Sequence, residues 1–353
     1  GRGGAGREPL KPLYTVADAR VALDRLRPLA YGLRERLSPD VEIRFRDAGH
    51  ILGSAIVELW IDENDGPKKL AFSGDLGNNH AALLRQPETI DAADVVLLES
   101  TYGDRDHRPF PETLRELARI LEQAAHDGGN VLIPAFAVGR TQELLYYLGE
   151  FYRAGKFRQA KVFLDSPLAI AATEVHRRHQ DLFNREARGE LRRYGADARE
   201  FLPPLSYTHT PEESMAINRV SGGAVIIAGS GMCTGGRIRH HLKWNLWRES
   251  AHVVFVGFQA EGTPGRAIID GAKRITLLGE DIAVRAQIHT LGGFSAHAGQ
   301  SELVEWIGHL RAARPRVCLV HGEPDKMAAL ARRIELAHGL KATIPAPGES
   351  ISF

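Results

Sequence analysis

Short apolar segments alternate with helix-like segments through the second half of the chain, and this alternation most constrains the fold. Strand-like runs begin at Asn130, Lys161, Gly223 and His252, and a helical pattern follows each of them. A helix between two strands returns the chain to the same edge of a sheet, so that consecutive strands lie parallel. We therefore predict an α/β unit with a mostly parallel, helix-covered sheet.

The first hundred residues show a different pattern. Apolar and charged residues alternate over residues 41–46, which indicates a half-buried strand. The runs 55–61 and 70–72 flank a turn signal at residues 64–66, which predicts a hairpin. A fourth apolar run, residues 95–98, is typical of a fully buried strand. A polar residue that could bind a ligand follows the first strand, the hairpin and the fourth run. These residues are His50, Asp75 and Glu99, in that order.

Two further histidines lie in glycine-flanked turns. His297 stands in the segment GGFSAHAG, and His321 directly follows the apolar run VCLV. Taken singly, each is better explained as a structural histidine. Three histidines with Asp75 and Glu99, all in short turns, instead favour a zinc hydrolase, because zinc binds imidazole and carboxylate and keeps a position for water when it is catalytic.

Three glycine-rich turns between strands and helices add a second signal. Such turns expose backbone N–H groups at the positive end of a helix, where a phosphate can bind. Two of them have an arginine nearby, Arg140 and Arg237. The residues predicted to bind phosphate or RNA are Arg140, Thr141, Ser230, Gly231, Gly262 and Thr263.

The composition of the chain limits the classes of protein to which it can belong. The formal net charge is +1 and the pI is about 8.0, so a nucleic-acid partner would have to bind a local cleft rather than a generally basic surface. Two cysteines exclude a disulfide framework and predict a cytoplasmic location. No apolar run is long enough for a membrane span.

Two other segments carry structural expectations only. His176 and His179 stand on an arginine-rich helical segment, where we expect a solvated face rather than a metal site. Residues 185–204 are highly charged and end in two prolines, which predicts an exposed excursion.

Eight motifs occur in a fixed order that resembles the β-CASP branch of the metallo-β-lactamase superfamily. They are DAGHILGSA, FSGDLG, LLESTYG, IPAFAVGRTQELL, GSGMCTGGR, GFQAEGTPGR, FSAHAG and VHGE. The resemblance implies an α/β fold in which a β-CASP domain is inserted into a metallo-β-lactamase αββα-type domain. We accordingly expect a partial metallo-β-lactamase domain over residues 1–104, the inserted domain over 105–291, and a return to the first domain over 292–353.

The resemblance also implies a role for each candidate. His50 would bind a first zinc, Asp75 would bridge two zinc ions, and His321 would bind the second. His297 would act as general acid or contact the scissile phosphate, and Glu99 would orient its ring. Together they imply a ribonuclease that cleaves RNA phosphodiester bonds, with single-stranded RNA in the cleft between the two domains.

The family's His-x-His-x-Asp-His motif does not occur in these 353 residues. We expect a truncated chain, inactive or weakly active, which starts with the Gly/Arg-rich arm GRGGAGREPLKP. Two zinc ions are expected in the full-length protein, and fewer or none in this chain. A natural pseudo-enzyme is the other explanation. The alternatives to the ribonuclease are a non-catalytic RNA-binding or scaffold subunit and a thioesterase-like small-molecule hydrolase, and a homodimer is left open.

Overall fold

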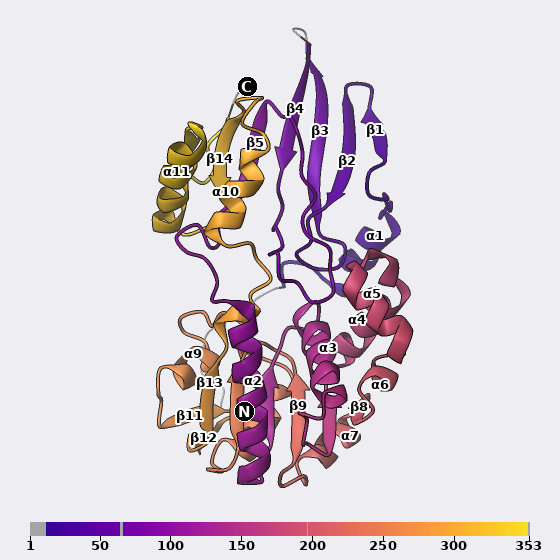
Figure 1. Ribbon diagram of the computed structural model, residues 1–353, viewed down its shortest axis with the longest axis vertical. Coiled ribbons are helices and arrows are strands. Elements are labelled where there is room, and N and C mark those ends of the chain that lie inside the picture. The colour runs from indigo at the N-terminus through magenta and orange to yellow at the C-terminus, as the bar shows by residue number, and fades with distance from the viewer. Residues whose placement is uncertain (1–11, 64–65, 196, 352–353) are drawn as a thin grey trace.

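The computed structural model describes residues 12–63, 66–195 and 197–351. Two units lie one above the other along the long axis of the molecule, each built around its own sheet (Figure 1). Most of the Gly/Arg-rich arm and the first two residues of the predicted hairpin turn lie outside the described residues.

The first unit contains a seven-stranded sheet. Its strands from one edge to the other are β1 (Arg34–Ser38), β2 (Val41–Asp47), β3 (Ala55–Glu63), β4 (Gly66–Phe72), β5 (Val95–Glu99), β14 (Arg316–Val320) and β15 (Ala342–Thr343). The strands β1 to β4 form an antiparallel meander, which confirms the predicted hairpin. The strands β4, β5, β14 and β15 are parallel. Late segments of the chain therefore complete a sheet that early segments begin.

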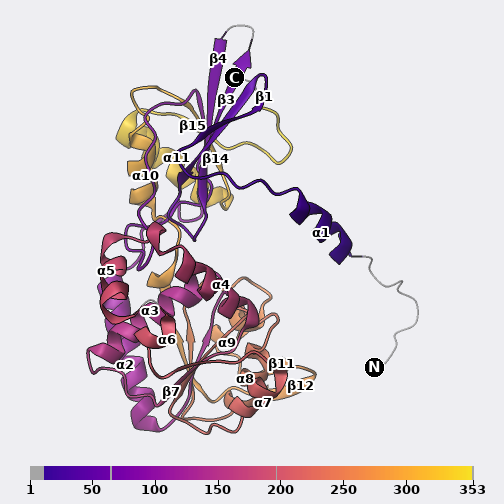
Figure 2. The same cartoon turned by 90° about the vertical axis from the view of Figure 1, so that its right-hand side faces the viewer.

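Helices α10 (Gln300–Gly308) and α11 (Pro324–His338) lie together on one side of this sheet (Figure 2). They bury Leu303, Ile307 and Leu330 against Val96 and Leu319 of the central strands. Helix α1 (Val16–Asp24) projects away from the sheet and buries none of its residues. It begins with a capping box formed by Thr15 and Asp18.

The second unit contains a six-stranded parallel sheet, as the alternating pattern predicts. Its strands in spatial order are β13 (Gln287–Thr290), β10 (His252–Phe255), β6 (Val131–Pro134), β9 (Ala224–Ala228), β7 (Lys161–Leu164) and β8 (Leu205–Tyr207). Both faces are covered. Val131 and Ile133 point into a core with α2 (Phe110–Asp127) and α3 (Arg140–Arg153), whereas Leu132 packs with α8 (Ile238–Asn245) and α9 (Pro264–Ile269).

The remaining elements lie at the margins of this second unit. They are α4 (Pro167–Arg178), η1 (Gln180–Leu182), α5 (Arg185–Tyr194), α6 (Ala198–Phe201), α7 (Pro211–Ile217) and the hairpin of β11 (Arg274–Leu277) and β12 (Glu280–Ala283). The exposed excursion predicted for residues 185–204 is wrong. Ala187, Leu191 and Phe201 are buried there in a cluster with Leu83, because these three apolar residues of the charged segment pack against the loop before β5.

Two connections join the units. One runs from the end of β5 to α2, and the other runs from the end of β13 through η2 (Gly292–Phe294) to α10. They are bonded to each other: the Gln300 amide donates to the Gly103 carbonyl at 2.6 Å, and the Ser301 N–H donates to Asp106 Oδ1 at 2.7 Å. The predicted boundaries at residues 104 and 291 fall in these connections and stay predictions. Among the described residues, no helix is both long and apolar enough to cross a membrane.

Candidate metal centre

All five polar residues singled out in the sequence meet at one edge of the seven-stranded sheet. Asp75 follows β4, Glu99 is the last residue of β5, and His321 follows β14. Because these three strands are parallel neighbours, their carboxyl ends meet at the same edge. His50 enters from the loop after β2, and His297 enters from the second connection, where it forms a β-bridge to Gly77.

Asp75 lies between two histidines, with one carboxylate oxygen toward each. Its Oδ2 is 3.9 Å from Nε2 of His50, and its Oδ1 is 3.2 Å from Nδ1 of His321. His50, Asp75 and His297 also offer three ligand atoms that lie within 4.8 Å of one another. The nitrogen of His50 that faces Asp75 is Nε2. Imidazole nitrogens gathered beside a carboxylate in this way fit a metal cation such as zinc.

Burial sets the charge of His50. Desolvation, helped by the nearby His297, lowers the pKa of His50 to about 4. The imidazole is therefore neutral at pH 7, which is the form that binds a metal.

His297 and Glu99 form a second pair within the centre. Nδ1 of His297 is 3.1 Å from Oε1 and 3.2 Å from Oε2 of Glu99, and the carboxylate is almost fully buried. The same carboxylate accepts the Leu76 N–H at 2.7 Å and the Thr101 N–H at 3.3 Å. Glu99 therefore fixes the ring of His297 and the backbone next to Asp75 together.

The pKa values of this pair move in opposite directions. Burial acts to lower the pKa of His297, but the hydrogen bond and charge of Glu99 outweigh it and raise that pKa. Burial acts to raise the pKa of Glu99, but the hydrogen bond from His297 outweighs it and lowers that pKa. Each partner stabilises the charged form of the other.

His321 is the most exposed of the five and has an unusual backbone. Its side chain is 58% exposed, and its φ is +53°, a left-handed conformation that is uncommon outside glycine. Next to it, a Cβ on Gly322 would lie 2.6 Å from the Ser100 carbonyl oxygen. The close approach of residues 100 and 322 thus fixes the turn that directs His321 toward Asp75.

The predicted phosphate-binding side chains of α3 are engaged within the protein. Arg140 forms an ion pair with Glu143, and its guanidinium lies over the ring of Phe294. Thr141 is buried, and its hydroxyl donates to the Phe136 carbonyl at 2.7 Å. A role for Arg140 and Thr141 in phosphate binding stays a prediction.

The other two glycine-rich turns, at residues 229–232 and 261–263, also lie in the second unit. The Ser230 hydroxyl accepts the Gly235 N–H at 3.2 Å, and Gly231 is buried beneath an aromatic ring. Gly262 has a φ of +78°, and Thr263 caps α9 by accepting the Arg266 N–H. Their role in RNA binding also stays a prediction.

A buried acid that our sequence reasoning missed holds Arg237. Asp165 follows β7 and is fully buried. Its Oδ1 accepts the guanidinium of Arg237 at 2.7 Å, and its Oδ2 lies 2.6 Å from Nε2 of His241. Arg237 also donates to the His209 carbonyl. The signal that identified Glu99, an acidic residue directly after an apolar strand, could also have identified Asp165.

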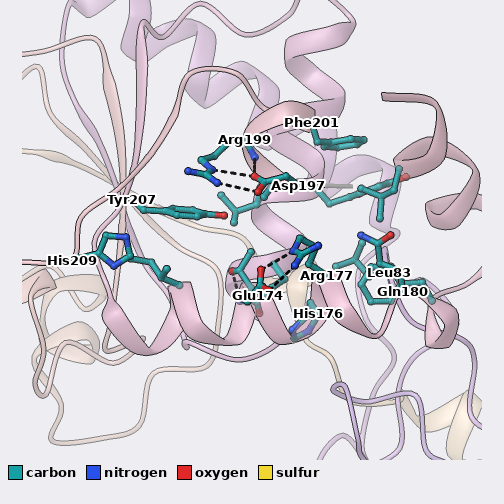
Figure 3. A pocket seen from close by; sticks show the side chains of 18 residues that line it. Leu83, Glu174, His176, Arg177, Gln180, Asp197, Arg199, Phe201, Tyr207 and His209 are labelled. Atoms are coloured by element: carbon teal, nitrogen blue, oxygen red, sulfur yellow. Dashed lines mark hydrogen bonds and ion pairs between the residues drawn. The ribbon is translucent and has the colours of Figure 1, made fainter. Parts of the chain in front are cut away.

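A separate cavity of about 280 Å³ lies among helices of the second unit, and Leu83 of the first unit also lines it (Figure 3). Its wall includes Leu83, Tyr207, and the ion pairs Glu174–Arg177 and Asp197–Arg199. None of the predicted site residues lines it. His176 also belongs to this wall and is 5% exposed, so the solvated face expected for it is wrong. Its Nδ1 lies 2.8 Å from the Ala172 carbonyl.

Comparison with known protein families matches two models to this chain. The Beta-Casp domain matches residues 141–268, and the Zn-dependent metallo-hydrolase RNA specificity domain matches residues 281–345. The first match covers α3 to α9, and the second covers β13, His297 and His321. The second unit is therefore a β-CASP domain.

Several curated proteins are similar over almost the whole chain. Ribonuclease TTHA0252 of Thermus thermophilus is 41% identical over 342 residues, which are 97% of this chain and 76% of the relative. An RNase J-like protein of Methanocaldococcus jannaschii is 30% identical over 96% of this chain and 77% of its own length. Transcription termination factor FttA of Pyrococcus abyssi is 33% identical, and the chain spans about half of its length. The chain belongs to the β-CASP branch of the metallo-β-lactamase superfamily.

Proposed function

We propose that this protein is a zinc-dependent ribonuclease that hydrolyses phosphodiester bonds of single-stranded RNA. The observation that carries the proposal is Asp75 between two histidines, with one carboxylate oxygen toward each. A carboxylate in this position can bridge two cations a few ångströms apart, which is the arrangement of two-metal phosphodiesterases. The similarity to a protein named as a ribonuclease supports RNA as the substrate.

His50, Asp75 and His321 would hold zinc. Bound zinc would polarise a phosphate oxygen and lower the pKa of a water molecule. His297 lies against His50, with ring centroids 4.3 Å apart, and its Nδ1 is bonded to Glu99, which leaves Nε2 for the reacting phosphate. With Nδ1 bonded to Glu99, the protonated ring can donate a proton from Nε2 to the leaving oxygen.

The test measures zinc and RNA cleavage with the full product of the reading frame that encodes this sequence. We expect about two zinc ions per chain by mass spectrometry and cleavage of a 5′-labelled single-stranded oligonucleotide. His321→Ala should lower the zinc content and abolish cleavage. His309→Ala is the matched control, because His309 is exposed and lies outside the centre.

RNA binding without hydrolysis is the second candidate function. It is supported by the relatives named as a transcription termination factor, a title that describes no cleavage. Tight RNA binding without zinc or cleavage would replace the ribonuclease with this candidate. Hydrolysis of thioesters without any RNA cleavage would instead indicate a small-molecule hydrolase. The count of two zinc ions, the homodimer and the cytoplasmic location stay predictions.

A further inference from the structure

Two phenylalanine side chains are exposed at one edge of the β-CASP sheet. Phe136 follows β6 and is 48% exposed, and Phe258 follows β10 and is 59% exposed. Strands β6 and β10 are parallel neighbours, so the two residues leave the sheet at the same, carboxyl-terminal edge. Large aromatic side chains are normally buried, so two of them exposed at one edge indicate a binding surface.

The ring of Phe136 rests on glycine backbone. A Cβ on Gly231 would lie 3.0 Å from Cδ2 and Cε2 of this ring, and a Cβ on Gly257 would lie 4.0 Å from Cε2. Gly231 follows β9 and Gly257 follows β10, so the ring spans the ends of the strands on both sides of β6. Glycine at both positions gives the ring room to lie across the strand ends, with its other side outward.

Gln259 makes the surface rigid. It is 5% exposed, and its amide nitrogen lies 2.8 Å from the Gly231 carbonyl, 3.2 Å from that of Gly257 and 3.1 Å from that of Phe258. One side chain thus ties the loops after β9 and β10 together. A surface held in this way loses little conformational entropy when a ligand binds.

This edge of the sheet faces the candidate metal centre. The turn that begins with Phe136 continues to Gly139, where a Cβ would lie 2.9 Å from Cγ2 of Ile51, the residue after His50. Strand β13, next to β10, leads from the same edge to His297 within seven residues. Beside Phe258 there is a hollow of about 270 Å³, lined among others by Arg266 and Thr290.

We propose that Phe136 and Phe258 form a stacking platform for the unpaired bases of single-stranded RNA next to the phosphate at the metal centre. The inference rests on the proposed function and adds how the substrate is recognised. Every base has an aromatic face, so stacking tolerates any sequence. Paired bases are stacked inside a duplex and cannot reach the rings, so the platform selects unpaired nucleotides.

The test measures binding of a fluorescent 12-nucleotide oligoadenylate by anisotropy, with EDTA present to prevent cleavage, and uses the full product of the reading frame that encodes this sequence. Phe136→Ala and Phe258→Ala should each weaken binding roughly 5- to 100-fold. Phe136→Trp should bind like the unaltered protein, because tryptophan keeps an aromatic ring at this position. The slope of affinity against salt should not change, because neither variant removes a charge. Trp247→Ala is the control, because Trp247 is also 48% exposed and follows α8 at the other end of the sheet.

An oligonucleotide with abasic sites separates stacking from other effects. The unaltered protein should bind the abasic strand more weakly than oligoadenylate, and the double variant Phe136→Ala with Phe258→Ala should bind both strands alike. If the alanine substitutions weakened binding of the abasic strand as much as binding of oligoadenylate, the stacking platform would be wrong. If the unaltered protein binds RNA and both alanine variants bind equally well, the platform is wrong and the proposed function stands. If the unaltered protein binds no RNA, both proposals fail.

Discussion

Nδ1 of His297 lies 3.1 Å from Oε1 of Glu99, although the two residues are 198 positions apart in the sequence. Glu99 ends a strand of the first sheet, whereas His297 follows the last strand of the second. The whole β-CASP domain is therefore inserted between two partners of one hydrogen bond. Folding of the inserted domain brings its two ends together, and this pair forms beside those ends.

The first prediction concerns Glu99→Gln. The amide can still accept hydrogen bonds but carries no charge, so it no longer raises the pKa of His297. A general acid loses activity as the pH rises through its pKa, so the alkaline fall in cleavage rate should move to lower pH. We expect roughly a 10- to 100-fold loss at neutral pH, measured as a pH profile of RNA cleavage. An unchanged profile would show that His297 is not the acid.

A second prediction concerns zinc binding by this chain. A metal that binds only the folded state raises the unfolding temperature, and at 100 times the dissociation constant it adds about 2.7 kcal/mol. Zinc should therefore raise the melting temperature by several degrees, and EDTA should reverse the shift. His50→Ala should abolish the shift and His309→Ala should keep it. A shift that persists in His50→Ala would place the metal elsewhere.

The third prediction concerns close backbone contacts at the centre. A Cβ on Gly77 would lie 2.0 Å from the Gly49 carbonyl oxygen, so Gly77→Ala must separate two loops that carry Asp75 and His50. We expect a loss of about 3 kcal/mol in unfolding free energy and a smaller zinc shift. In contrast, Gly189→Ala should stabilise by roughly 0.5–1 kcal/mol, because it lies inside α5 with open space around it. Urea unfolding measures both changes.

The fourth prediction concerns acid stability. Glu58 is buried and bonded to Arg44 at 2.6 Å, Arg46 at 3.1 Å and Lys69 at 2.6 Å. Burial acts to raise the pKa of Glu58, but hydrogen bonds from Arg44 and Lys69 outweigh it and lower that pKa from 4.5 to about 2. The stabilisation is therefore complete above pH 4.5 and is lost as the pH falls toward 2.

The ionised Glu58 contributes on the order of 3 kcal/mol to the free energy of unfolding at neutral pH. Glu58→Gln should lower stability at pH 7, because three cations lose their carboxylate. Between pH 4.5 and 2 the variant should lose less stability than the unaltered protein. Urea unfolding at several pH values tests this, and parallel curves would exclude Glu58 as the titrating group.

The alternation of strand-like and helix-like segments was sufficient to predict the parallel sheet. The spacing of apolar residues and the residues of turns are local features that can be recognised in the sequence. A polar residue after an apolar strand, or a histidine in a glycine-flanked turn, is also a local feature, and these two features picked out the five residues that meet at the centre. Local patterns failed where long-range packing decides the structure. His176 and Leu191 stand in charged segments, and only the cluster around Leu83 shows why they are buried.

The predicted phosphate sites show a related limit. Sequence places Arg140 and Arg237 beside glycine-rich turns, but it cannot reveal which carboxylate each guanidinium binds. Glu143 and Asp165 are those partners. The exposed rings of Phe136 and Phe258 were likewise not predicted, because a phenylalanine after an apolar strand is indistinguishable from a core residue until the neighbouring loops are placed.

The paired connections between the domains have a mechanical consequence. Two bonded segments side by side restrict the rotation of one unit against the other, whereas a single segment would allow it. His107 Nε2, on the first connection, lies 2.8 Å from the His297 carbonyl on the second. A change in the angle between the two units would therefore act on the backbone next to His297, so that the relative position of the units and the position of this imidazole are coupled.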